Sequence, residues 1–379
     1  MKTKDLCMLF AGLFMVGCSA DEEIANISTS ESNAISFNVV SNNPQTKATM
    51  IDGVGDLQSH PFEVFAFKNN TYYMGSEGNI DDWKDHGVEL KYESHSWIYT
   101  DPDAIYYWPH QESLNFYAIS PSDKIGESSV TSATFNSITK GFTSILLEGW
   151  VDPVDVLYAT ALNMTKENSS NGKVTLRFKH ALSQVVFQAR KQANSQSISV
   201  EVKGMQLYNV NSSGTYTYPA ADSENGTWIS DWPSMRTINL VSNDPIEVQS
   251  GDIITSLSLT NPLLCIPQTL TAWSPSTSNP INDQVDSEAG ISDSGQTSFL
   301  RIQCKIHDGD HYFVGSEREY GYTYVPFGAT WEEGKRYIYT LYFGAGYNAN
   351  GSEIDIVPIT FDAEVTDWGR DNNNDITDF

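Results

Sequence analysis

The sequence predicts an all-β fold made of two tandem β-sandwich domains, which follow an export signal and a flexible tether. Three observations support this prediction. Short segments that alternate apolar and polar residues recur from residue 34 onward, turn-forming pairs such as Asp52-Gly53 separate them, and no long stretch keeps a helical period of 3.6 residues. Closely spaced short strands with polar turns are typical of β-sandwiches, and 379 residues are enough for two domains of ordinary size.

The amino terminus has the layout of a bacterial export signal. A short basic start is followed by an apolar run over residues 6–16, and Gly17 precedes Cys18. A small residue directly before a cysteine is typical of lipoprotein signals, in which the cysteine is acylated after cleavage. We therefore predict a signal peptide at residues 1–17 and lipidation of Cys18, for example by palmitate. Met15 departs from the usual leucine, and an ordinary signal peptide with an incidental cysteine is the alternative.

The region after the signal divides into a tether and the start of the first domain. Residues 18–33 are polar and acidic, which predicts a flexible tether. The N-terminal domain is predicted at residues 34–168. It opens with a strand whose apolar face would consist of Ile35, Phe37 and Val39.

A second strand of this domain, at residues 62–67, is apolar at nearly every position and is expected to be buried on both faces. Further strands are expected at residues 88–92, 97–99, 104–108, 114–120 and 145–147.

The polar segment at residues 163–172 is the best linker candidate, and we predict a C-terminal domain at residues 169–379. Strands are expected there at residues 174–178, 185–187, 199–207, 236–240, 253–259, 263–266, 300–306, 320–326, 337–343 and 354–365.

Two cysteines lie in the folded part of the chain, Cys265 and Cys304, both in strand-like apolar segments. The sequence leaves two interpretations open, a disulfide formed in an oxidising compartment or two buried thiols that act as small apolar side chains. No CxxC pair or Cys/His cluster is present in the sequence, so a metal site is not predicted.

The formal net charge of −26 argues against nucleic-acid binding, because a strongly acidic surface repels phosphates. The sequence holds no GxSxG, no HExxH and no phosphate-binding glycine loop before a helix. Carboxylates such as Asp81, Asp82 and Asp101 have no distinguishing spacing and are interpreted as surface charges. We therefore predict a protein that is not an enzyme and that needs no cofactor.

An ordered set of motifs gives the chain a family resemblance. It comprises ISFNV at residues 35–39 followed by TKAT, DVLYA at 155–159, FKHAL at 178–182, LLCIPQTL at 263–270, WEEGKRYIYTLYF at 331–343 and ITFDAEVTDW at 359–368. Together with the lipoprotein signal, this order resembles the fimbrillins, lipoprotein pilins and adhesins of Gram-negative anaerobes that form type V pili.

The resemblance implies two transthyretin-like β-sandwiches, a lipid anchor in the outer membrane, and a place in the fimbrium beside other fimbrial subunits. It also implies that a trypsin-like protease cuts the N-terminal segment, which removes the first strand and opens a groove for a strand of another subunit. Lys47-Ala48 is the candidate processing site, although the family's cut site is often an arginine. Ile35, Phe37 and Val39 would form the removable strand.

The candidate C-terminal strand, with Ile359, Phe361, Val365 and Trp368, alternates as expected for one buried face, in its own domain or in a neighbour. The tail beyond Trp368 is short and polar, so a dedicated donor strand after it is not obvious, and a tip or accessory subunit stays open.

The alternative function is a surface lipoprotein that binds glycans and serves polysaccharide capture. Its candidate residues are aromatic side chains in polar surroundings, Trp228, Trp232 and Trp273, since exposed aromatic rings stack on sugars. Under either interpretation a host or bacterial surface glycan or protein is a candidate receptor.

Overall fold

The protein is described by a computed structural model that covers residues 33–41, 54–78, 85–125, 131–146, 154–192, 197–230, 235–239, 244–250, 253–257, 262–278, 280–281, 297–344, 346–354 and 359–368. Within these ranges the fold is almost entirely β, and a single four-residue helix, α2 (Val54–Leu57), is present. The predicted all-β class is therefore confirmed. Across the same ranges, no helix is long and apolar enough to span a membrane.

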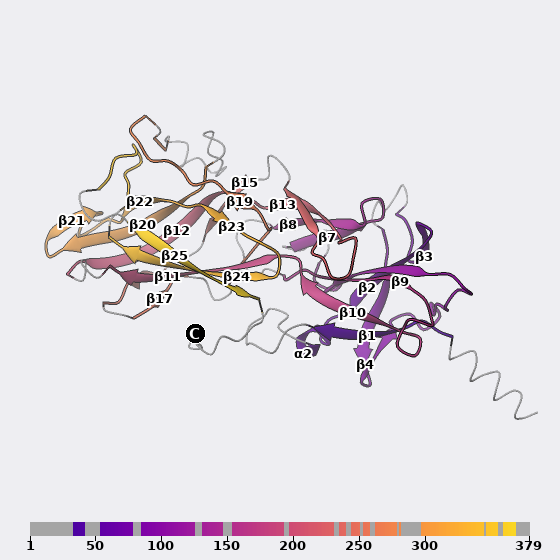
Figure 1. Ribbon diagram of the computed structural model, residues 1–379. Helices are drawn as coiled ribbons and strands as arrows, with labels where there is room; N and C mark the ends of the chain where they lie inside the picture. The colour runs from indigo at the N-terminus through magenta and orange to yellow at the C-terminus, as the bar shows by residue number, and fades with distance from the viewer. Residues whose placement is uncertain are drawn as a thin grey trace, which may run out of the picture.

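An eight-stranded sheet forms the end of the molecule drawn at the right of Figure 1, in the order β1-β10-β9-β6-β2-β4-β5, with β3 paired to β2. Its strands are β1 (Ser36–Ser41), β2 (Phe62–Lys68), β3 (Thr71–Met74), β4 (Val88–Glu93), β5 (Ser96–Tyr99), β6 (Leu114–Ser120), β9 (Leu157–Met164) and β10 (Lys173–His180).

Strand β2 is buried on both faces, as predicted for residues 62–67. Phe62 and Val64 of β2 lie in one buried cluster, which fills the inside of the curled sheet. Phe65 and Phe67 point to the opposite face and join the larger cluster of the rest of the protein. A strand that separates two cores needs apolar residues at successive positions, which explains why β2 shows no polar alternation.

Two further sheets pack face to face at the left of Figure 1. The five-stranded sheet consists of β17 (Thr255–Ser256), β11 (Ser183–Lys191), β24 (Lys335–Phe343) and β25 (Thr360–Asp367), with β18 (Leu263–Cys265) paired to β11. The six-stranded sheet consists of β15 (Met235–Asn239), β12 (Ser199–Asn211), β20 (Phe299–Asp308) and β21 (His311–Val314), with β16 (Ile246–Glu247) and β22 (Gly321–Pro326) at the sides of β12 and β20.

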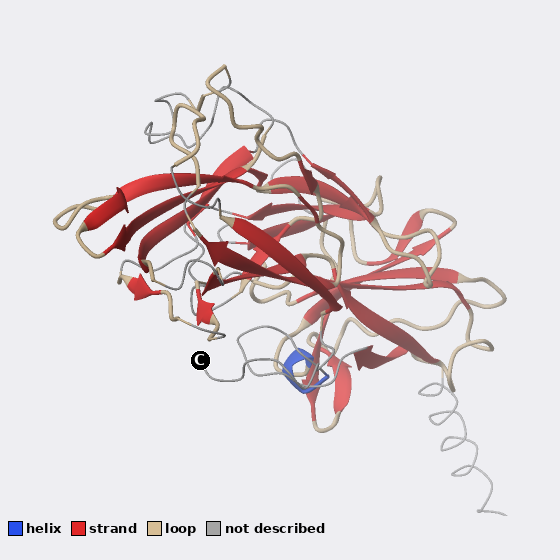
Figure 2. Ribbon diagram, turned by 60° about the vertical axis from the view of Figure 1, so that its left-hand side comes forward, coloured by secondary structure: helices blue, strands red, loops and turns tan. Residues whose placement is uncertain are grey.

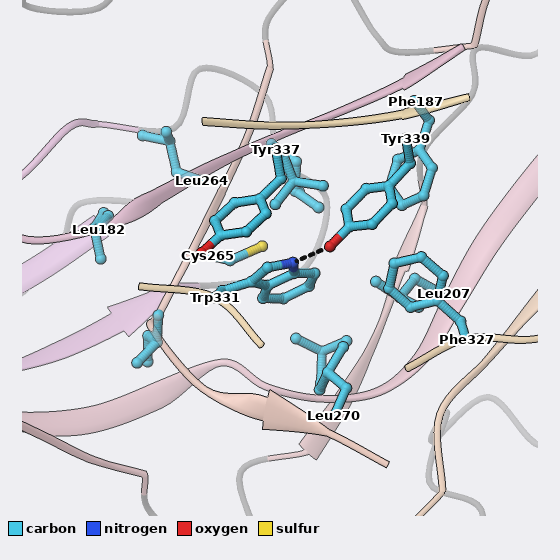
Figure 3. Packing of buried hydrophobic residues seen from close by; sticks show 14 of the residues in the cluster. Leu182, Phe187, Leu207, Leu264, Cys265, Leu270, Phe327, Trp331, Tyr337 and Tyr339 are labelled. Carbon is cyan, nitrogen blue, oxygen red and sulfur yellow. Dashed lines mark hydrogen bonds between the residues drawn. The ribbon is translucent and has the colours of Figure 1, made fainter. Parts of the chain in front are cut away.

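The core between these two sheets is rich in aromatic side chains (Figure 3). Trp331 and Tyr339 are both buried, and the indole Nε1 of Trp331 donates a hydrogen bond of 2.9 Å to the Tyr339 hydroxyl. A buried indole N–H needs such an acceptor, because leaving it unpaired would cost free energy.

A four-stranded sheet, β14-β13-β8-β7, contributes to the same large cluster, and Figure 2 shows that strands make up nearly all of the regular structure. Its strands are β7 (Thr131–Asn136), β8 (Gly141–Leu146), β13 (Ser213–Thr217) and β14 (Thr227–Ser230), and a small ladder joins β19 (Thr269–Leu270) to β23 (Ala329–Thr330). In two of the sheets, strands that precede residue 168 pair with strands that follow it. β8 pairs with β13, and both β1 and β9 pair with β10. The division at 168/169 remains a prediction.

Candidate strand-exchange groove

The first strand, β1, lies at one end of the eight-stranded sheet and pairs with one neighbour. It runs parallel to β10, in a register from Ser36 opposite Lys173 to Ser41 opposite Phe178. An end strand shares only one ladder of hydrogen bonds with its sheet. Removing β1 would therefore break one ladder and leave the backbone of β10 open along one side.

The predicted apolar face of β1 is buried. Ile35, Phe37 and Val39 are 0%, 4% and 7% exposed, whereas Asn38 between them is exposed. These three side chains belong to the cluster inside the curled sheet. The alternation of apolar and polar residues in the sequence therefore matches the alternation of buried and exposed side chains in this strand.

Phe37 is the central contact of this strand. Its ring lies 5.9 Å from Phe116, 6.3 Å from Phe62 and 6.5 Å from Tyr99 between centroids, each in an edge-on arrangement. Edge-to-face ring pairs add to the free energy that apolar burial already provides. The pocket that holds Phe37 would be the deepest part of the groove if β1 left.

A segment at residues 106–108 holds the start of β1 from the side opposite β10. The Ile35 N–H donates to the Tyr106 carbonyl at 2.8 Å, and the Trp108 N–H donates to the Asn33 carbonyl at 3.0 Å. The Tyr99 hydroxyl donates to the Ile35 carbonyl at 2.8 Å. We call residues 99–108 the clamp, because they fix the entry of β1 into the groove.

The structure of residues 104–108, within the clamp, differs from the sequence prediction. A strand was expected at residues 104–108, but the structure has irregular chain there, with an isolated β-bridge between Ala34 and Tyr107. Trp108 turns inward, where its Nε1 donates to the Gly172 carbonyl at 2.9 Å. Tyr106 and Trp108 therefore contact residues 33–35 and 172 through single hydrogen bonds and do not form a strand of the sheet.

The last described strand, β25, lies at the edge of the five-stranded sheet and pairs antiparallel with β24. Its apolar face is covered only at the ends. Ile359 and Trp368 are buried and Phe361 is partly buried near Phe327, at 5.3 Å between ring centroids, whereas Val365 is 53% exposed. β25 is thus held mainly by its hydrogen bonds to β24 and by the buried residues at its two ends.

Trp368 connects the end of β25 to β10, the strand beside β1. Its ring stacks on His180 at 3.9 Å and 8°, and the backbone N–H of Trp368 donates to the Gly334 carbonyl at 2.8 Å. His180 Nδ1 in turn lies 2.7 Å from Asp155 Oδ2, and both side chains are buried. The two candidate strands of the sequence therefore approach the same strand, β10, from different sheets.

Cys265 and Cys304 are buried free thiols, so the disulfide that the sequence left open is not formed in the structure. Cys265 lies beside Trp331 and Tyr337 in Figure 3. Burial in apolar surroundings raises the pKa of both thiols, which keeps them protonated and unreactive at neutral pH.

Other predicted residues lie outside the described residues or elsewhere in the fold. Cys18, Lys47 and Ala48 lie outside the described residues, as does Trp232. Trp228 packs against Phe142 and donates to the Ala181 carbonyl at 2.8 Å, and Trp273 is buried. The clamp and the Trp368–His180 stack were not predicted, because each joins residues more than sixty positions apart and leaves no local pattern.

Comparison with known proteins places the chain in a family. A family described as fimbrillin-like matches residues 46–368. This chain belongs to the fimbrillin-like family. The resemblance inferred from the ordered motifs is therefore confirmed.

Individual relatives of this fimbrillin-like protein are distant. A curated relative, the fimbrium subunit Fim1C of Phocaeicola vulgatus, is 25% identical over 243 residues, which cover 60% of this chain and 62% of the relative. The alignment thus spans about three fifths of that relative's length.

One solved structure supports the fold. The crystal structure of a fimbrial protein from Bacteroides vulgatus matches with a TM-score of 0.52 and 14% identity, covering 89% of this chain and 99% of the other. The crystal structure of a putative cell adhesion protein from Bacteroides uniformis matches less well, with a TM-score of 0.44 and 12% identity. That match covers 88% of this chain and 99% of the other.

Proposed function

We propose that this fimbrillin-like protein is a non-catalytic fimbrial subunit or surface adhesin that assembles by exchange of β-strands. It would be exported as a lipoprotein, anchored in the outer membrane through Cys18, and carried into the fimbrium after proteolysis at Lys47-Ala48. Its partners would be further copies or related subunits. The family and the fimbrial relative support the general role, and the geometry of β1 supports the assembly step.

The position of the processing site explains how a cut could release β1. Lys47 lies between β1, which ends at Ser41, and α2, which begins at Val54. A cut after Lys47 separates β1 and the lipid anchor from the rest of the chain, so that only non-covalent contacts would hold β1. A polar connecting segment between two elements is a favourable protease substrate.

The groove left by β1 would have a strong tendency to bind another strand. Loss of β1 exposes unpaired backbone groups along β10 and the apolar pocket of Phe62, Tyr99 and Phe116. An added strand restores the hydrogen-bond ladder and fills the pocket with alternate side chains. Affinity would come from the ladder and selectivity from the pocket.

The observation that carries the proposal is a shared pattern in the first and last strands. Residues 35–39 read Ile-Ser-Phe-Asn-Val, and residues 359–363 read Ile-Thr-Phe-Asp-Ala. A strand with the second pattern would place Ile359 and Phe361 where Ile35 and Phe37 lie. Residues 359–368 of another copy are therefore the candidate occupant, which needs no donor strand beyond Trp368.

Limited trypsin treatment of the purified precursor tests the proposal. We expect a cut after Lys47, verified by sequencing the new amino terminus, and a ladder of multiples on an unheated denaturing gel. Lys47→Gln should abolish both the cut and the ladder. A trimmed product that stays monomeric would contradict strand exchange.

Variants of β25 test whether residues 359–368 are the segment that fills the groove of another copy. Phe361→Ser should suppress the ladder without affecting the cut, because a polar side chain would enter the aromatic pocket. Val365→Ser is the matched control, since it lies on the same face but beyond the shared pattern, and it should leave the ladder intact. Equal ladders from both variants would show that another segment fills the groove.

A further inference from the structure

We propose that the outer face of the first strand, β1, is the centre of a seat that rests on an anionic bilayer surface and holds the anchored precursor against the membrane. The inference rests on the lipid anchor of the proposed function. The seat has three rows of residues. They are Ile105 and Tyr107 of the clamp, then Ala34, Ser36 and Asn38, then Lys173, Thr175 and Arg177 of β10.

Alternation in β1 sets the middle row of the seat. The side chains of Ile35, Phe37 and Val39 are buried in the core of the curled sheet. Successive side chains of a strand point to opposite faces, so Ser36 and Asn38 between them point outward. The outer face of β1 therefore carries small, uncharged polar groups.

β10 alternates in the same way beside β1 (Figure 1). Lys173 and Arg177 are exposed. The residues that alternate with them are buried in the curled sheet, namely Val174, Leu176 and Phe178. Because Lys173 lies opposite Ser36 in the parallel ladder, its side chain shares the outer face of β1.

Tyr107 lies on the other side of the middle row. An antiparallel bridge joins it to Ala34, and bridged residues point to the same side of a sheet. Ala34 is two positions before Ser36, which places the Tyr107 side chain on the outer face together with Lys173. The Tyr73 hydroxyl donates to the Tyr107 carbonyl, so the backbone that presents this side chain is held in place.

The clamp side of the seat exposes apolar surface. Ile105 and Tyr107 are 44% and 47% exposed and are two positions apart in the chain. A tyrosine has an apolar ring and a polar hydroxyl, which suits the boundary between lipid headgroups and acyl chains. An isoleucine beside it adds apolar area that this boundary can bury. The carboxylates of the clamp, Asp101 and Asp103, lie in the turn before Ile105 and not among the residues of the seat.

The β10 side of the seat is cationic, although the chain has 48 acidic and 22 basic residues. Within the described residues, neither Lys173 nor Arg177 forms an ion pair with a carboxylate. Lys166 and Glu167 lie next to the start of the seat, where Lys166 donates to the Asn33 side chain at 3.1 Å, and their charges offset each other. The two cations of β10 are thus available to lipid phosphates.

The position of the anchor identifies what this face meets. Residues 19–33 connect Cys18 to the described fold, so the start of β1 lies within about 50 Å of a lipid on Cys18. A short tether raises the local concentration of the bilayer at this face, so that weak contacts are enough to hold it. Cations at the contact strengthen binding to an anionic surface, and apolar side chains strengthen it further.

The net charge of −26 opposes this seating at long range. At about 0.15 M salt the screening length is about 8 Å, so carboxylates elsewhere on the molecule are screened and the groups in contact with the headgroups decide. Seating should therefore be measured at that ionic strength.

Processing would dismantle the seat. Ser36 and Asn38 belong to β1, so the face loses its middle row when β1 leaves. The cut that separates the subunit from its lipid would therefore also release it from the bilayer surface.

Lysine footprinting on vesicles tests the inference. The chain from residue 18 onward, which keeps every described residue, is coupled through Cys18 to a maleimide lipid. The coupling is selective, because Cys265 and Cys304 are buried. The vesicles consist of phosphatidylcholine alone or of phosphatidylcholine and phosphatidylglycerol in equal parts, and mass spectrometry measures how fast each lysine is acetylated.

We expect Lys173 to react about fivefold more slowly on the anionic vesicles than on the neutral ones, the factor that corresponds to one lysine at an anionic surface. Lys124 is the internal control. Its side chain is 54% exposed, and it follows the Ser120 end of β6, whereas the Leu114 end of β6 pairs with Met164 near the seat. Lys124 should react equally fast on both kinds of vesicle.

Two variants separate loss of seating from loss of folding. Tyr107→Ser removes exposed apolar surface but keeps the backbone contacts of the clamp, so it should reduce the protection of Lys173 and leave thermal unfolding unchanged. Ile138→Ser is the matched control. It removes a side chain that is 89% exposed in the turn between β7 and β8, and it should leave the protection of Lys173 intact.

Equal acetylation of Lys173 on both kinds of vesicle would overturn the inference, as would equal protection of Lys173 and Lys124. Protection in solution that rises with protein concentration would show that a second copy covers this face, and would overturn it too. The chemical coupling makes these outcomes independent of acylation in cells. An unmodified Cys18 peptide from cell membranes would instead refute the proposed anchor, and with it the seat.

Discussion

The first and last described strands carry nearly the same residues but have different environments. In β1 the apolar face is enclosed by the curled sheet and the clamp, whereas in β25 the middle of the same pattern faces solvent. Both strands lie at the edge of their sheets. The difference shows that an alternating pattern specifies a strand with one apolar face, and that the neighbours decide how much of that face is covered.

The largest expected difference between the two strands concerns their phenylalanines. Phe37→Ala should lower the free energy of unfolding by about 3–5 kcal/mol, the usual range for deleting a buried aromatic ring. Phe361→Ala should cost about 1 kcal/mol, because its ring is only partly buried. Chemical denaturation of both variants measures this, and equal losses would mean that the two strands are held alike.

A second test concerns the end of β25. Trp368→Ala removes a buried ring stacked on His180 and should cost about 3 kcal/mol, the low end for such a truncation. Since the ring joins β25 to β10, the variant should also make the end of β25 more accessible to proteolysis. Val365→Ala, at an exposed position of the same strand, is the control and should change stability by less than about 0.5 kcal/mol.

A third test removes one polar contact of the clamp. Tyr99→Phe deletes the hydroxyl that donates to the Ile35 carbonyl and keeps the ring beside Phe37. We expect a loss of about 1 kcal/mol, the typical net contribution of a hydrogen bond. Amide hydrogen exchange of residues 35–39 should accelerate in this variant, and unchanged exchange would show that the clamp does not hold β1.

The smallest expected effect lies in the ion pair between Lys335 of β24 and Asp367 of β25. The hydrogen bond to Asp367 raises the pKa of Lys335 above 10.5, so its stabilising contribution is present below that pH and is lost as the pH rises through the folded-state pKa. Both side chains are over a third exposed, so Asp367→Asn should cost no more than about 0.5 kcal/mol. The stability gap between variant and unchanged chain should close as the pH rises through the folded-state pKa of Lys335, and a gap that persists after Lys335 has lost its proton would exclude the ion pair as its source.

Much of the fold was predictable from local patterns, and the errors have a common cause. The strand at residues 62–67 and the buried side of β1 followed from periodicity, because burial repeats every second residue in a strand. Residues 104–108 have equally strand-like composition but form part of the clamp. Tyr106 and Trp108 have hydrogen-bond partners in residues 33–35 and 172, and sequence composition carries no information on such distant pairing.

The sequence by itself determined the all-β class, the fimbrillin-like family and the apolar faces of the first and last strands, because these depend on residue types and on their order. The tertiary structure alone decided that β1 pairs in parallel with β10, that Trp368 stacks on His180, and that the Arg301 guanidinium stacks on the Tyr322 ring. Each of these contacts depends on the register between strands that are distant in the chain. That register is set by the packing of the whole fold, since a one-residue slip would turn every side chain of a strand to the opposite face.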